Sequence, residues 1–175
     1  KNIKHFLGKP IIGYAIQKAL EVNIFDDVII STDDLEIAEI SKEYGGNVPF
    51  YRSEKCSNDF ATTADVIYEV LMRLKEDGVQ LEYICCLYPT TPILSSERLS
   101  EAYKLVSSNE YDTVLTIQKF SYPIQRAFKR NQNGSLEWDR PEFELTRSQD
   151  VEPMYHDAGQ FYFIKVNQFL ENRKL

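Results

Sequence analysis

One short apolar run constrains the fold of this chain more than any other feature. Residues 83–88 read Tyr-Ile-Cys-Cys-Leu-Tyr without a charge, and the Pro-Thr-Thr-Pro segment at residues 89–92 ends the run. Such a run is typical of a strand buried on both faces of a parallel sheet. In open α/β sheets, ligands bind beyond the carboxyl ends of these strands, so Tyr88, Pro89 and Thr90 stand where a site is expected. Taken alone, the segment is more typical of a plain strand-to-helix turn.

Helix and strand patterns alternate along the first two thirds of the chain. Apolar residues recur at helical spacing after Pro10, whereas residues 28–31 are rich in β-branched side chains. This alternation predicts right-handed βαβ units and a mostly parallel sheet covered by helices. The expected helices lie around residues 10–20, 34–44, 66–77 and 96–106, and the expected strands around residues 28–31, 49–51, 83–88 and 113–117.

The pattern changes in the last third of the chain. Asn133-Gly134 separates two short segments, and Asn-Gly is a strong signal for a β-hairpin. Residues 161–164 then predict a late buried strand, which a final helix follows. A length of 175 residues suits one domain with a sizeable core. We therefore expect a single α/β domain over residues 1–175, with an inserted hairpin arm at about residues 120–155.

Composition argues against several classes of protein. A net charge of −7 is unfavourable for a general binder of nucleic acid or membrane surfaces, although a few local Arg and Lys side chains suffice for a small anion. No apolar run reaches the roughly 20 residues of a membrane span. The three cysteines provide no disulfide framework, which indicates reduced thiols in a cytosolic protein. The sequence contains no motif of a zinc site, a dinucleotide-binding fold or a Walker loop.

Polar residues gather at the ends of several predicted strands. Arg52, Asp59, Thr62 and Thr63 belong to a loop that runs into a helix N-terminus, where backbone amides favour phosphate or carboxylate. An ordinary surface loop explains this cluster equally well. The two Asp residues at 33–34 are more typical of a helix cap than of catalysis.

The densest polar segments precede the late aromatic strand. Residues 144–150 and 155–160 combine arginine, glutamine, acidic residues, histidine and glycine. Polar groups so close to a hydrophobic strand suggest a sugar-sized ligand held by hydrogen bonds. His156 beside Asp157 suggests general acid–base chemistry, although a lone His in a turn more often has no catalytic role. Arg126 offers a further guanidinium that suits a carboxylate.

Six short blocks occur together, in this order, in one known family. They are residues 1–3, 8–12, 30–34, 88–92, 146–150 and 155–162. The chain therefore resembles the CMP-sugar synthetases, the acylneuraminate cytidylyltransferase family. The last two blocks are more similar to the pseudaminic acid branch of that family than to the sialic acid branch. The resemblance covers essentially the whole chain, and the blocks are specific jointly rather than singly.

This resemblance implies a three-layer, Rossmann-like nucleotidyltransferase fold of the glycosyltransferase-A type. It also implies a cytoplasmic, Mg²⁺-dependent enzyme that joins a nine-carbon nonulosonic acid to CTP and releases pyrophosphate. Pseudaminic acid is the sugar of the matching branch, and the hairpin arm resembles the arm through which members form homodimers. The alternatives are a sialic or legionaminic acid cytidylyltransferase and a sugar-nucleotide binding module without catalysis.

The resemblance also implies roles for individual residues. The nucleotide is expected to lie against Lys1, Asn2, Arg52, Asp59, Thr62 and Thr63. The sugar is expected to contact Tyr88, Pro89, Thr90, Arg126, Arg147, Gln149, Tyr155 and Gln160. His156 and Asp157 are the candidates to accept the proton of the sugar hydroxyl, although we favour a role for them in orienting the sugar.

The chain departs from the family pattern in three places. The family's basic, glycine-containing phosphate loop would precede Lys1, and its magnesium-holding Asp-x-Asp pair would follow Leu175. We therefore expect that the chain as given lacks sequence at both ends, and that the metal ligands lie outside it. Tyr88 stands where many sialic acid enzymes carry Gln before the Pro-Thr pair, which argues against sialic acid as the substrate.

Overall fold

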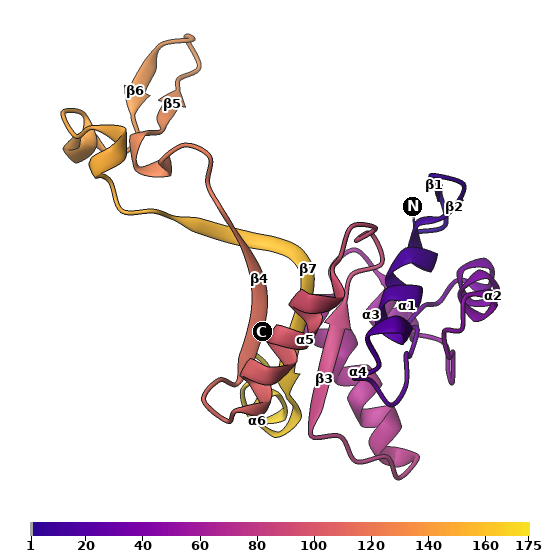
Figure 1. Cartoon of the computed structure of the whole chain (residues 1–175). Helices are drawn as coiled ribbons and strands as arrows, with labels where there is room; N and C mark the ends of the chain where they lie inside the picture. Colours follow the sequence, from indigo (N-terminus) through magenta and orange to yellow (C-terminus); the bar gives the residue numbers. More distant parts are fainter. Residues whose placement is uncertain (1) are drawn as a thin grey trace. The chain divides into compact units, whose positions relative to one another are not determined.

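The computed structural model describes residues 2–175, and the chain divides into two compact units (Figure 1). The first unit runs to Leu115 and resumes at Gln160, and the second unit consists of Thr116–Gly159. Two strands, β4 (Thr113–Lys119) and β7 (Tyr155–Lys165), each have residues in both units. We describe each unit by itself.

A three-stranded sheet forms the centre of the first unit. Its order is β3 (Tyr83–Leu87), β7 and β4, so the last strand of the chain lies between two earlier ones. The β3–β7 pair is antiparallel, and its register runs from Tyr83 opposite Lys165 to Leu87 opposite Phe161. Residues 161–164 of β7 are all buried, which matches their uninterrupted aromatic and apolar sequence.

The expected mostly parallel sheet is not confirmed. Every strand pair whose register is described in residues 2–175 is antiparallel, and the one parallel contact is an isolated bridge between Ile29 and Asn47. The expected strand at residues 28–31 is reduced to that bridge, and no strand forms at residues 49–51. The antiparallel centre arises because β7 takes the place beside β3 that a parallel βαβ unit would otherwise occupy.

Helices pack on both faces of this sheet. On one face, α4 (Thr63–Glu76) and α6 (Val166–Asn172) contribute to a core made of Ile67, Leu71, Tyr162, Ile164, Val166 and Phe169. On the other face, α5 (Ser96–Ser107) contributes to a core made of Leu94, Leu99, Ala102, Val106, Phe161 and Phe163. Alternate residues of β3 and β7 therefore supply two separate cores.

The neighbouring cysteines show this alternation directly. Cys86 packs against the core beneath α4, and Cys85 packs against the core beneath α5. Burial raises the pKa of both thiols, that of Cys86 to about 11. Both side chains are therefore protonated, apolar packing elements of the sheet, as their position in the strand predicts.

The helix boundaries follow local capping signals. Asp34 caps α2 (Leu35–Glu43) and Ser95 caps α5, each by accepting backbone N–H groups of the first turn. Thr62 and Asp65 form a reciprocal capping box at the start of α4. The remaining elements of the first unit are β1 (His5–Phe6), β2 (Lys9–Pro10), α1 (Ile11–Val22) and the short α3 (Glu54–Ser57). Within residues 2–175 no helix combines the length and apolar character that a membrane crossing requires.

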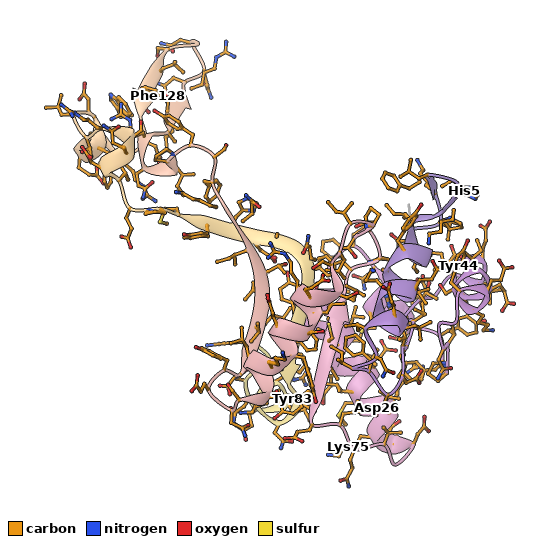
Figure 2. The ribbon with its side chains drawn as sticks, viewed as in Figure 1. His5, Asp26, Tyr44, Lys75, Tyr83 and Phe128 are labelled. Carbon is orange, nitrogen blue, oxygen red and sulfur yellow. The ribbon has the colours of Figure 1, made fainter. Side chains whose placement is uncertain are left out.

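The second unit contains a β-hairpin at the predicted turn. Strands β5 (Phe128–Arg130) and β6 (Leu136–Trp138) pair antiparallel, and Gly134 adopts a positive φ of 87° between them. The rings of Phe128 and Trp138 lie 4.2 Å apart across the hairpin; Phe128 is labelled in Figure 2. Three 3₁₀ turns complete the unit: η1 (Ile124–Arg126), η2 (Pro141–Phe143) and η3 (Ser148–Asp150).

We predict that the Phe163→Ala substitution lowers the free energy of unfolding by about 3–5 kcal/mol. The Phe163 ring is 1% exposed and contacts the rings of Phe25, Tyr103 and Phe161. Urea denaturation of the purified protein measures the change. Phe60, whose side chain is 93% exposed, provides the matched control, and Phe60→Ala should stay within about 0.5 kcal/mol of the parent. Equal losses in the two variants would contradict the assignment of the core.

Candidate functional site

The turn after β3 holds the first group of predicted site residues. The backbone N–H of Tyr88 donates to the Gln160 carbonyl at 2.9 Å, which extends the pairing of β3 with β7 by one residue. The Thr91 hydroxyl donates to the Tyr88 carbonyl at 2.8 Å and closes the turn around Pro89 and Thr90. The side chains of Tyr88 and its two successors are half-buried. The sequence prediction of a strand followed by a tight turn is therefore correct here.

Tyr88 also links this turn to the first turn of α4. Its hydroxyl lies 3.1 Å from the Thr63 hydroxyl, and its ring packs edge-on against Tyr162 at 5.7 Å. Thr62, the preceding residue, uses its hydroxyl to cap α4. A 14-residue helix that begins beside the end of β3 places backbone N–H groups and a positive dipole end there, an arrangement that favours anions.

Arg52 reaches the same end of the sheet from a different segment. Its Nε donates to the Ser31 hydroxyl at 3.1 Å, and a second guanidinium nitrogen donates to the Ser31 carbonyl. The charge of Arg52 also lowers the pKa of the Cys86 thiol, against the larger effect of burial. Arg52 is therefore fixed by Ser31 and lies close enough to β3 to affect Cys86 electrostatically.

The other predicted nucleotide residues are less constrained. Asp59 is exposed in a turn that the Asn58 side chain closes by accepting from the N–H groups of Phe60 and Ala61. The carbonyl of Asn2 accepts from the backbone of Ile12 at 3.0 Å. Lys1 lies outside the described residues. In this group the structure pairs Thr63 with Tyr88 at the end of β3 and places Arg52 near Cys86 of the same strand. Asp59 has no side-chain hydrogen bond or ion pair to any of residues 2–175.

In the second unit, Arg126 has a clear structural role. Its guanidinium donates to the carbonyls of Phe143 (3.0 Å), Glu144 (3.4 Å) and Thr146. It also lies over the Trp138 ring at 5.1 Å. These contacts tie residues 143–146 to the hairpin. They account for Arg126 without a ligand.

Arg147 carries the same charge as Arg126 but differs from it in exposure and in interaction partners. Its side chain is exposed, and no ion pair to Glu144, Asp150 or any other acidic residue is found within residues 2–175. Gln149 and Tyr155 are exposed as well. Since the Arg147 guanidinium has no hydrogen-bond partner among residues 2–175 either, its donors are available for a bidentate contact with a carboxylate.

The histidine–aspartate pair at the start of β7 is held by local contacts. The His156 ring packs against Phe120 at 4.9 Å, and its Nδ1 lies 2.8 Å from the Asp157 carbonyl. Because a carbonyl oxygen only accepts, Nδ1 is the donor in this contact, and Nε2 is the acceptor whenever the ring carries a single proton. The Asp157 carboxylate accepts from the Gly159 N–H at 2.7 Å. His156 therefore presents an acceptor at Nε2, while Asp157 shapes the turn.

Two contacts of this region were not predicted from the sequence. Ser31 and Arg52 are 21 residues apart, and the only signal for their contact was that each follows a predicted strand. Glu69 of α4 accepts from the Ser53 backbone and hydroxyl at 2.9 and 2.7 Å, although nothing in its helical position marks it. No group of three or more His, Cys, Asp or Glu residues within residues 2–175 has the geometry to hold a metal ion.

Comparison with known proteins identifies a family. The family model described as cytidylyltransferase matches residues 1–173. The chain is 40% identical over 171 residues to a pseudaminic acid cytidylyltransferase of Campylobacter jejuni, covering 98% of this chain and 74% of that protein. It is 26% identical over 175 residues to the CMP-N,N'-diacetyllegionaminic acid synthase of Legionella pneumophila, covering 99% of this chain and 74% of that protein.

A solved structure shows which fold the chain has. The structure of a CMP:2-keto-3-deoxy-manno-octonic acid synthetase complexed with CTP superposes with a TM-score of 0.68. The two share 17% sequence identity, and the match covers 98% of this chain and 70% of that one. At this level of identity the likeness establishes the fold alone, an α/β nucleotidyltransferase fold.

We predict that Arg126→Ala accelerates amide hydrogen exchange in residues 141–150, because it removes the donor that holds the carbonyls of Phe143, Glu144 and Thr146. Hydrogen bonds from a charged group contribute about 1.5–3 kcal/mol, which corresponds to roughly a tenfold to hundredfold faster exchange. Exchange followed by mass spectrometry measures it. The neighbouring Arg147→Ala variant serves as the control and should exchange like the parent. If both variants exchange alike, the distinction between the two arginines is wrong.

Proposed function

The chain belongs to the cytidylyltransferase family, and from this membership we propose that it joins a nonulosonic acid, pseudaminic acid, to CTP. The products are the CMP-sugar and pyrophosphate. The observation that carries the proposal is the 40% identity over nearly the whole chain to a pseudaminic acid cytidylyltransferase. The lower identity to a legionaminic acid enzyme, 26%, favours pseudaminic acid over that sugar. Tyr88, which stands where many sialic acid enzymes carry Gln, argues against sialic acid.

The proposed chemistry is a single nucleotidyl transfer. The anomeric hydroxyl oxygen of the sugar attacks the α-phosphorus of CTP and forms a new O–P bond. The bond from that phosphorus to the bridging oxygen breaks, and pyrophosphate leaves with its electron pair. Catalysis of such a transfer depends mainly on alignment and on stabilisation of charge. This requirement explains why the chain needs no covalent nucleophile.

For the nucleotide, we propose a location at the end of β3 in the first unit. The N-terminus of α4 supplies N–H groups suited to an anion, and Arg52 supplies positive charge nearby. Thr63 and Tyr88, whose hydroxyls are 3.1 Å apart, add polar contacts at the same place. Thr62 contributes indirectly, because its hydroxyl is occupied in capping the helix. Lys1, Asn2 and Asp59 remain candidates by family resemblance.

For the sugar, we propose that Arg147 is the main contact of its carboxylate. The support is chemical: Arg147 is exposed and has no acidic partner within residues 2–175, whereas Arg126 is occupied by three carbonyls. His156 accepts the proton of the attacking hydroxyl at Nε2 or orients that hydroxyl, and Asp157 holds the turn. Gln149 and Tyr155 are further sugar contacts in this proposal. Tyr88, Pro89, Thr90 and Gln160, which belong to the first unit, remain candidates by family resemblance.

Three parts of the proposal concern the whole enzyme. Mg²⁺ dependence rests on the family resemblance, and since residues 2–175 supply no cluster of metal ligands, we assign no step to the ion. We also propose a cytoplasmic location and a homodimer formed through the hairpin arm. The dimer is supported by exposed apolar side chains such as Leu136 and Leu145 in the second unit, and sedimentation of the full-length protein measures it.

We predict that the full-length enzyme releases pyrophosphate from CTP in the presence of pseudaminic acid at least about tenfold faster than with legionaminic or sialic acid, judged by kcat/KM. A preference of that size corresponds to about 1.4 kcal/mol of differential transition-state binding. Coupled pyrophosphate detection with each sugar measures it, and EDTA-treated enzyme provides the control for metal dependence. Turnover with sialic acid alone would overturn the choice of sugar. Binding of CTP and sugar without turnover would instead support a binding module.

We predict that Arg147→Ala lowers kcat/KM for the sugar about a hundredfold, the loss expected for a charge-assisted bidentate contact worth roughly 1.5–3 kcal/mol. Arg147→Lys keeps the charge but not the planar pair of donors, so it should recover only part of the activity. The Kd for CTP, measured by calorimetry, should remain that of the parent in both variants. Unchanged sugar kinetics in Arg147→Ala would exclude the carboxylate role.

A further inference from the structure

Glu69 is a largely enclosed carboxylate on the face of α4 that meets the segment before α3. Its side chain is 13% exposed. One oxygen accepts from the Ser53 N–H at 2.9 Å, and the other accepts from the Ser53 hydroxyl at 2.7 Å. Arg73, one turn further along α4, forms an ion pair with the first oxygen at 2.9 Å. Both carboxylate oxygens are therefore occupied by specific donors.

Arg73 extends this set of contacts to the other side of Arg52. A guanidinium nitrogen of Arg73 donates to the Tyr51 carbonyl at 2.8 Å, and the group lies over the Phe50 ring at 4.9 Å. Ser53 follows Arg52 directly, and Tyr51 precedes it. Two side chains of α4, linked to each other, thus hold the backbone on both sides of Arg52.

These contacts of Glu69 and Arg73 hold the segment in place of the strand that the sequence predicted at residues 49–51. The segment has no ladder partner among residues 2–175, and its backbone is joined to the segment after residues 28–31 by a hydrogen bond from the Arg52 N–H to the Thr32 carbonyl at 2.9 Å. The guanidinium of Arg52 is then directed onto Ser31. The position of Arg52 consequently depends on the contacts of Glu69 and Arg73 more than on regular secondary structure.

We propose that Glu69 is a positioning residue for nucleotide binding, which acts by fixing Arg52 through Ser53 and Arg73. The inference rests on the proposed function, since Arg52 matters in this way only if it contacts the nucleotide. Glu69 itself touches neither substrate in this scheme. Its removal should therefore weaken CTP binding through Arg52 and leave the sugar contacts unaffected.

The surroundings of Glu69 keep its carboxyl group charged, as a positioning role requires. Burial acts to raise the pKa of its carboxyl, but hydrogen bonds from Cys56 and Ser53 and the charge of Arg73 together lower it below the usual value. The group is therefore an anion at neutral pH. Replacing it with an amide of the same shape leaves the Arg73 charge without its partner and reduces the bonds that Ser53 donates.

The test compares five variants of the full-length enzyme by calorimetric titration with CTP and by steady-state kinetics. Glu69→Gln removes the charge. Ser53→Ala removes the hydroxyl that donates to Glu69 and that also accepts from the Cys56 N–H at the start of α3, and it answers the question if Glu69→Gln does not fold. Arg52→Ala and the Arg52→Ala/Glu69→Gln double variant complete a double-mutant cycle. Glu39→Gln is the matched control, because Glu39 forms an exposed ion pair with Lys42 on α2.

We expect Glu69→Gln to raise the Kd and KM for CTP about tenfold, the change that loss of a contact worth about 1.4 kcal/mol produces. Ser53→Ala should have a smaller effect in the same direction, and Glu39→Gln none. The sugar KM and the kcat at saturating CTP should stay at the parent values. When Arg52 is already replaced by Ala, the additional Glu69→Gln substitution should weaken CTP binding little further.

Three results would overturn the inference. An unchanged Kd for CTP in Glu69→Gln, with Arg52→Ala still impaired, would leave Glu69 a purely structural residue while the proposed function stands. If the losses of CTP affinity in Arg52→Ala and Glu69→Gln add fully in the double variant, Glu69 acts independently of Arg52. Normal CTP binding by Arg52→Ala would remove the nucleotide role of Arg52, and the positioning role of Glu69 with it.

Discussion

The insertion of β7 between β3 and β4 is the constraint on which the rest of the first unit depends. Burial of four consecutive residues, Phe161 to Ile164, requires that both faces of the strand be covered. Helices α4 and α6 cover one face and α5 covers the other. Because alternate side chains of β7 belong to different cores, a shift in its register would disturb both cores at once.

That placement also determines where the candidate site forms. Pairing of β7 with β3 continues to Tyr88, whose N–H donates to Gln160, and the chain then turns through Pro89 and Thr90. The start of α4 lies against the same point through the hydroxyls of Thr63 and Tyr88. The end of β3 therefore combines a tight turn, a helix N-terminus and the Arg52 segment, three features that suit an anionic ligand.

Local signals in the sequence predicted most elements, whereas tertiary pairing decided the rest. The Asn-Gly turn, the Asp34 cap and the apolar run before Pro89 act over a few residues, and each appears in the structure where it was expected. Strand direction depends on which distant segment supplies the partner, and no local pattern specifies that β7 returns beside β3. The prediction of a strand at residues 49–51 was wrong for the same reason, since the backbone of this segment lacks a ladder partner among the described residues. Among the site residues, the occupation of Arg126 by carbonyls and the exposure of Arg147 depend on loop geometry that residue type does not reveal.

Gly159 divides β7 into an exposed half and a buried half. The residue has a φ of 62°, in the left-handed region that other residues rarely adopt, and the Asp157 carboxylate fixes the turn around it. Residues 155–157 are exposed, whereas residues 161–164 are fully enclosed. Mutations in the first half can accumulate without disturbing the packing of the second half. Under the proposed assignment of Tyr155 and His156 to the sugar, a strand built this way lets an evolving lineage change which sugar it recognises while the fold beneath stays the same.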